Sequence, residues 1–96
     1  MAVGDTVATM ASVATNSYLS IQPSSGSEWV IHNIYHDCDI TLEQYNGAAT
    51  LVFDSASGPG VYAKYAFHVT NSVYLRVKNA YTATTGLIGY DGIVTK

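Results

Sequence analysis

The pair Asn46-Gly47, set between two short alternating runs, constrains the fold of this chain more than any other feature. An Asn-Gly pair favours a two-residue type I′ turn, because both central residues must adopt positive φ. The flanking runs then form a hairpin whose register opposes Tyr45 to Ala48, Glu43 to Thr50, Leu42 to Leu51 and Ile40 to Phe53. This register gathers four apolar residues on one face: Ile40, Leu42, Leu51 and Phe53. Three polar residues fall on the opposite face: Thr41, Glu43 and Thr50.

The remainder of the chain reads as further short strands. Alternating or apolar runs predict strands over residues 17–22, 28–35, 61–69, 73–78 and 86–95. In residues 28–35, Trp29, Ile31 and Tyr35 share one face. A three-residue loop predicts a second hairpin with Val69 opposite Val73, and the glycines of the last run predict a broken strand. A turn every 8 to 12 residues without helical periodicity is typical of an all-β sandwich of jelly-roll or Greek-key type, with seven or eight short antiparallel strands.

The length of 96 residues fits one domain with a buried core. Residues 1–16 are rich in Ala, Thr, Val and Ser, and we interpret them as an N-terminal arm or an edge strand. Residues 17–96 make up the predicted β-sandwich domain.

The chain carries few charges, since only 11% of its residues are charged against about 25% in an ordinary soluble domain. Such a surface resists association poorly, and we expect a homo-oligomer or a docked subunit. Four basic residues in a chain of net charge −3 argue against a nucleic-acid partner. No apolar run is long enough for a membrane span, and the first 15 residues do not resemble a signal peptide. We therefore expect synthesis in the cytoplasm and no membrane partner.

Potential metal ligands concentrate near Cys38, the single cysteine. A strand would hold His32 and His36 about 13 Å apart, too far for one transition-metal ion. Three carboxylates form a cluster, Asp37, Asp39 and Asp54, and the hairpin register sets Asp39 directly opposite Asp54. Calcium would relieve their repulsion, and so would simple divergence of the hairpin ends, so both alternatives stay open. We expect no cofactor.

Signatures of catalysis are missing from the sequence. It has no Gly-x-Ser-x-Gly elbow and no phosphate-binding glycine loop, while Glu28 and Glu43 are a carboxylate pair without further support. We do not expect an enzyme.

Tyrosines are the best candidates for a contact surface, because the chain has eight of them and few charges. An exposed tyrosine offers rigid contact area with a polar tip, which suits protein interfaces and sugar-binding sites. Four are predicted at an interface: Tyr18, Tyr45, Tyr74 and Tyr81.

Two segments resemble a family of small structural proteins of tailed bacteriophages. The first segment is QPSSGSEWVIHNIYH and the second is FHVTNSVYLRVKNAYTATTGLIGYDGIVTK. The family pattern falls on Gln22, Pro23, Gly26, Glu28 to Ile34, Tyr74 to Arg76, Asn79, Gly89 to Gly92, Thr95 and Lys96.

The resemblance implies a capsid decoration or cement protein with a jelly-roll-like domain and no catalytic residues. It implies the major capsid protein as partner, a location on the capsid surface of the virion, and self-association, with a trimer favoured. The alternative is a head-fibre or tail-fibre tip that binds a host-surface glycan. A stand-alone carbohydrate-binding module is a third possibility, although such modules usually carry a signal peptide.

Overall fold

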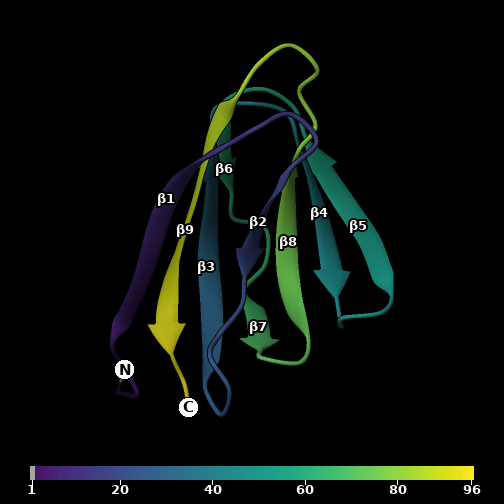
Figure 1. Cartoon of the computed structure of the whole chain (residues 1–96). Helices are drawn as coiled ribbons and strands as arrows, with labels where there is room; N and C mark the ends of the chain where they lie inside the picture. Colours follow the sequence, from purple (N-terminus) through teal and green to yellow (C-terminus); the bar gives the residue numbers. More distant parts are fainter. Residues whose placement is uncertain (1) are drawn as a thin grey trace.

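The computed structural model describes residues 2–96 as two antiparallel β-sheets packed face to face (Figure 1). Its nine strands are β1 (Thr6–Val13), β2 (Tyr18–Ile21), β3 (Glu28–His36), β4 (Ile40–Tyr45), β5 (Thr50–Ala56), β6 (Gly60–Tyr62), β7 (Phe67–Thr70), β8 (Tyr74–Asn79) and β9 (Gly86–Val94). The all-β sandwich expected from the sequence is confirmed, with nine strands in place of seven or eight. Within residues 2–96, no helix is long and apolar enough to cross a membrane.

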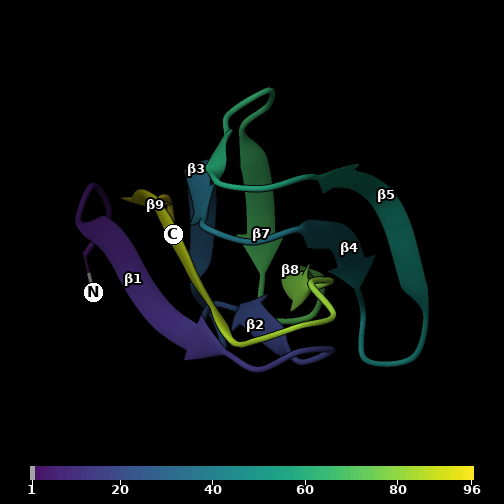
Figure 2. The same ribbon diagram turned by 90° about the horizontal axis from the view of Figure 1, so that it is seen from above.

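Sheet A has the strand order β1-β9-β3-β6, with β7 also paired to β3, and sheet B has the order β2-β8-β4-β5. Since β6 and β7 both pair with β3, they occupy the place of one interrupted strand. The two orders are then those of a jelly roll, in which the chain passes between the sheets at almost every connection. Figure 2 shows β1 and β5 at opposite extremes of the molecule.

The core between the sheets is built from aliphatic side chains that alternate along the strands. Its fully buried members are Ile21, Ile31, Ile34, Ile40, Leu42, Val69, Val77, Ile88 and Val94. The segment interpreted as an arm or an edge strand forms β1, which pairs with β9 along its whole length. Its Val7 and Val13 join the core cluster, so β1 is an edge strand that contributes to packing.

The predicted register of the Asn46-Gly47 hairpin is wrong. Its loop spans residues 46–49, and Tyr45 pairs with Thr50. Only Gly47 has positive φ, and the Asn46 side chain accepts hydrogen bonds from the N–H groups of Ala48 and Ala49 at 3.0 and 2.7 Å. This side-chain cap stabilises a four-residue loop in place of the two-residue turn.

The shifted register also changes what β5 buries. Glu43 pairs with Val52 and Leu42 with Asp54, so Phe53 is an extra, bulged residue. Leu51 and Phe53, predicted on one apolar face with Ile40 and Leu42, are 60% and 37% exposed. The physical reason is visible in Figure 2, where β5 curves away from the rest of the sandwich.

The second predicted hairpin is also wrong, although its turn forms. Thr70 N–H donates a 2.9 Å hydrogen bond to Val73 C=O, but β7 pairs with β3 in sheet A while β8 pairs with β2 and β4 in sheet B. The turn therefore carries the chain from one sheet to the other. Local patterning cannot distinguish such a corner from a hairpin.

The two central strands of sheet A, β3 and β9, each differ from the prediction in one feature. His32 is an extra residue in β3, so Trp29, Ile31 and Ile34 face the core while Tyr35 is turned outward. The last run is continuous, because Gly89 and Gly92 lie inside β9. A side chain at Gly92 would collide with the Val30 carbonyl group and lie 2.9 Å from the Ile31 Cα atom. Gly92 thus permits close strand packing and does not mark a turn.

Candidate interaction surfaces

Three of the four predicted interface tyrosines gather on the outer face of sheet B. Tyr18 comes from β2, Tyr45 from β4 and Tyr74 from β8, and the β4–β8 register sets Tyr45 directly opposite Tyr74. Their rings meet edge to face with centroids 5.7 Å apart. Tyr81 lies apart from them in the loop after β8, where its carbonyl oxygen accepts a hydrogen bond from the Thr15 hydroxyl group. The structure therefore brings three of the four residues together.

Arg76 is the centre of this group, although it is not among the predicted interface residues. Its guanidinium carbon lies 4.2 Å from the ring centroid of Tyr18 and 3.8 Å from that of Tyr45. Its Nε atom donates a 2.6 Å hydrogen bond to the carboxylate of Glu43. We call these five residues the tyrosine–arginine cluster: Tyr18, Glu43, Tyr45, Tyr74 and Arg76. The sequence contained a signal for Arg76, because the alternation in residues 74–78 places it on the same face as Tyr74.

The chemistry of the tyrosine–arginine cluster is that of a rigid contact surface. Stacking over two rings uses one π-face of Tyr18 and one of Tyr45, and the ion pair with Glu43 neutralises the guanidinium charge. Aromatic residues and arginine are the residue types enriched at protein interfaces. The cluster presents ring edges and hydroxyl groups at low net charge.

A second surface, on the outer face of sheet A, was not predicted. Five apolar or aromatic side chains from four strands are exposed there, and we call them the outer apolar face: Met10, Tyr35, Val61, Leu87 and Ile93. Gly89 lies between Met10 and Tyr35 in the strand register, and the missing side chain leaves a groove of about 390 Å³. The alternation along residues 28–35 placed Tyr35 on the same face as Trp29 and Ile31, because the bulge at His32 has no local signature.

Polar contacts fix Tyr35 within the outer apolar face. Its hydroxyl group donates a 2.5 Å hydrogen bond to Asp91, and Asn33 Nδ2 donates to the same carboxylate at 2.9 Å. These bonds, that of Tyr35 first, lower the pKa of Asp91. The bond to Asp91 in turn raises the pKa of Tyr35. The tyrosine ring is therefore held in one position beside the groove.

The three carboxylates considered for calcium have separate partners. Asp37 accepts from the Leu87 N–H group at 2.7 Å, and Asp39 accepts from the Gly58 N–H group at 2.7 Å. Asp54 accepts from the Tyr62 hydroxyl group at 2.8 Å, which lowers the pKa of Asp54. In the described part of the chain, no three His, Cys, Asp or Glu side chains are placed to hold a metal ion. The predicted opposition of Asp39 and Asp54 is wrong, because Leu42 faces Asp54.

The other candidate ligands also point to structural roles. His36 is buried, and its Nδ1 atom lies 3.0 Å from the Cys38 carbonyl oxygen, while His32 is exposed. Burial raises the pKa of the Cys38 thiol. A Cβ atom on Gly86 would lie only 2.8 Å from the Cys38 Cβ atom, so the thiol is packed against β9.

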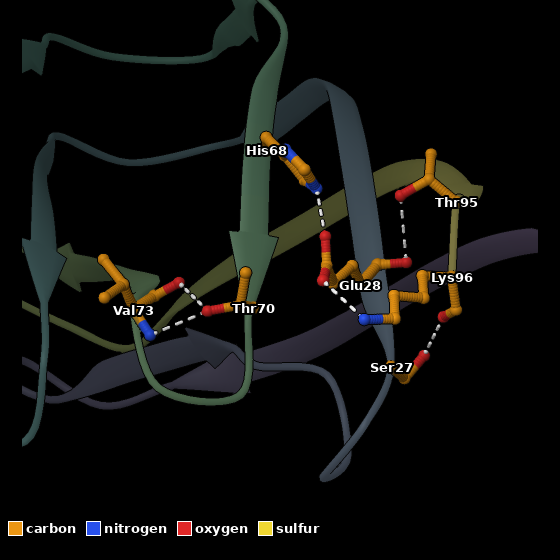
Figure 3. Close-up of polar contacts among 7 residues, drawn as sticks. All are labelled: Ser27, Glu28, His68, Thr70, Val73, Thr95 and Lys96. Carbon is orange, nitrogen blue, oxygen red and sulfur yellow. Dashed lines mark hydrogen bonds and ion pairs between the residues drawn. The ribbon is translucent and has the colours of Figure 1, made fainter.

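Glu28 and Glu43 do not form a carboxylate pair. Glu43 belongs to the tyrosine–arginine cluster, whereas Glu28 lies at the end of the sandwich shown in Figure 3. There its carboxylate is 2.8 Å from His68 Nε2 and 3.7 Å from Lys96 Nζ. The Glu28 main chain exchanges hydrogen bonds with Thr95 and Lys96, which fastens the C-terminal residues to β3.

No protein-family model matches the chain, and a search of curated proteins also found no match.

Proposed function

We propose that this chain is a capsid decoration protein of a tailed bacteriophage, which docks on the major capsid protein and stabilises the shell through protein–protein contacts. The observation that carries the proposal is the outer apolar face, where Met10 is 73%, Val61 54% and Leu87 41% exposed. Soluble monomers rarely leave several large apolar side chains together on a flat sheet face, and such patches commonly mark binding sites. The resemblance to phage structural proteins supplies the class of partner.

The low charge of the surface supports the same role. A shell-covering protein repeats one modest contact many times around a symmetric particle, so each contact can be weak. Jelly rolls occur in viral capsid proteins and also in lectins, so the fold alone does not choose between contact with protein and contact with sugar.

The alternative is a head-fibre or tail-fibre tip that binds a host-surface glycan, and the tyrosine–arginine cluster is the observation in its favour. Sugar rings stack on exposed aromatic faces. In this chain, however, Arg76 already occupies a face of both Tyr18 and Tyr45. This favours contact through ring edges and supports the decoration role over the glycan role.

Copy number distinguishes the two roles. We would measure copies per particle by quantitative mass spectrometry against the major capsid protein. Hundreds of copies are expected for a decoration protein, whereas a dozen would favour a fibre tip.

The docking face is tested by adding purified variants to shells that lack the protein. Val61→Asp and Leu87→Asp place charge on the outer apolar face and should abolish co-sedimentation with the shells. Leu51→Asp, at a comparably exposed position on β5, is the matched control and should still bind. Equal loss for all three variants, or no loss for any, would refute the assignment of this face.

A further inference from the structure

The free edge of β1 has an unusually regular arrangement of backbone groups. β1 pairs with β9 over eight consecutive residues without a bulge. Val94 N–H donates a 2.9 Å hydrogen bond to Asp5 C=O, and these two residues lie opposite each other in the register. Hydrogen-bonded pairs alternate in an antiparallel ladder, so odd-numbered residues of β1 face β9. Even-numbered residues therefore direct their N–H and C=O groups away from the sheet: Thr6, Ala8, Met10 and Ser12.

Each of the other sheet edges carries a feature that discourages pairing with another chain. β6 and β7 have three and four residues, and β2 has four and stops shortly before Pro23. β5 is interrupted by the bulge at Phe53 and carries Asp54. Short edges, bulges, proline and charge are the usual means by which proteins protect open sheet edges.

β1 has none of these protections. It is eight residues long and regular, and the sequence has no charged residue between Asp5 and Glu28. Within residues 2–96 no strand pairs with its outer edge. A long, regular, uncharged edge that is left open is a site for adding a strand.

We propose that β1 pairs antiparallel with β1 of a second copy of this chain, across a two-fold axis at Met10. Opposite residues in an antiparallel pair lie on the same sheet face, so even-numbered residues must oppose even-numbered ones. The register centred on Met10 satisfies this rule and uses residues 7–13 completely. It sets Met10 opposite the partner's Met10, Ala8 opposite the partner's Ser12, and Val7 opposite the partner's Val13.

A second copy of the chain fits this edge because no like charges meet across the axis and because the pairing extends the outer apolar face. Asp5, the nearest charged residue, comes opposite the partner's Thr15, so no like charges meet across the axis. The pairing joins two copies of sheet A into one continuous sheet and doubles the outer apolar face, with the two Met10 side chains at its centre. An isologous contact of this kind closes at two copies, so it predicts a dimer and not the trimer that the resemblance favours.

Solution mass is the first test, and it needs only the purified protein, so its outcome is independent of the capsid role. By light scattering after size exclusion, the protein should have twice the 10.2 kDa mass of the chain. Met10→Lys sets two ammonium groups against each other at the axis and should reduce the mass to that of one chain. The variant should remain folded as a single chain, because Met10 is largely exposed there. Leu51→Lys, on the β5 edge, is the matched control and should remain a dimer.

Cross-linking tests the register. The two Cα atoms at position 10 would lie about 5.5 Å apart, within disulfide range, whereas those at position 12 would lie about 14 Å apart. Mild oxidation should therefore join Met10→Cys chains and leave Ser12→Cys chains single. Cys38 is buried and provides no competing surface thiol.

Three results would overturn the proposal. A folded monomer at millimolar concentration would exclude self-pairing. A trimer whose mass is unchanged by Met10→Lys would place self-association elsewhere. Faster cross-linking at position 12 than at position 10 would exclude the register.

Discussion

Arg76 Nε donates a 2.6 Å hydrogen bond to a Glu43 carboxylate whose side chain is only 3% exposed. Glu43 lies on the predicted polar face of its strand, and Arg76 covers it there. An acid on the outside of a sheet is thus buried by its partner. The stability of sheet B depends on this pair, because removing the arginine leaves a buried charge without compensation.

Arg76→Ala is expected to lower the free energy of unfolding by about 3 kcal/mol, since an uncompensated buried carboxylate is costly. Urea denaturation followed by circular dichroism measures this change. Lys78→Ala is the control on the same strand, two residues away on the same face, and should cost less than about 0.5 kcal/mol. A midpoint for Arg76→Ala equal to that of Lys78→Ala would show that the ion pair contributes nothing.

Gly47→Val is expected to cost about 1–2 kcal/mol, because Gly47 has a φ of +90° and a β-branched residue is strained there. The open space around Gly47 makes the effect one of backbone strain alone. Ala48→Val, the next residue in the same loop, is the control and should be close to neutral. Full tolerance at Gly47 in a thermal unfolding experiment would contradict the loop geometry.

Gly92→Ala is expected to destabilise strongly, by about 3 kcal/mol or more, because the new methyl group would collide with the main chain of β3. Gly60→Ala offers the comparison, since its Cβ atom would meet the His36 ring at an ordinary 3.6 Å. Chemical denaturation of both variants should give a large and a small loss respectively. Similar losses would mean that β9 and β3 are less tightly packed at Gly92.

Lowering the pH should reduce the thermal stability of the wild type more than that of the Tyr35→Phe variant. The Tyr35 hydroxyl bond is the first cause of the lowered pKa of Asp91. A carboxylate whose pKa is lower in the folded state stabilises the fold above its unfolded value of about 3.9, and the stabilisation is lost as the pH falls through the folded value.

Thermal midpoints measured from pH 6 down to pH 2 would show this difference as a shallower acid decline in Tyr35→Phe. Tyr65→Phe is the control, because Tyr65 is exposed and Asp91 has no bond to it. Parallel curves for wild type and Tyr35→Phe would exclude a contribution from the Asp91 bond.

Most strands were predictable because each leaves a local mark in alternation and turn residues. The single strand predicted over residues 61–69 is wrong, because that run forms two short strands, β6 and β7. The partners of the strands were not predictable, since β1 and β9 lie at opposite ends of the chain and pair only through the tertiary fold. The second hairpin failed for this reason. A tight turn at Thr70 looks the same whether the next strand stays in the sheet or crosses to the other one.

The candidate surfaces were predictable only in part. Alternation placed Tyr45 and Tyr74 away from the core, but their contact depends on the β4–β8 register, which has no signal in either strand. One extra residue at His32 turned Tyr35 from the core to the outer face. A bulge of this kind is fixed by neighbouring strands, so periodicity along β3 could not show it.

The position of β9 between β1 and β3 has a consequence for how the chain folds during synthesis. The first strand and the third have their shared neighbour only after residues 86–94 have been made, so sheet A cannot close before that point of synthesis. Contacts between distant residues also make folding slow. Until the last strand arrives, β1 and β3 expose apolar segments to other nascent chains, and we expect the yield of native protein in cells to depend on chaperones that hold this intermediate.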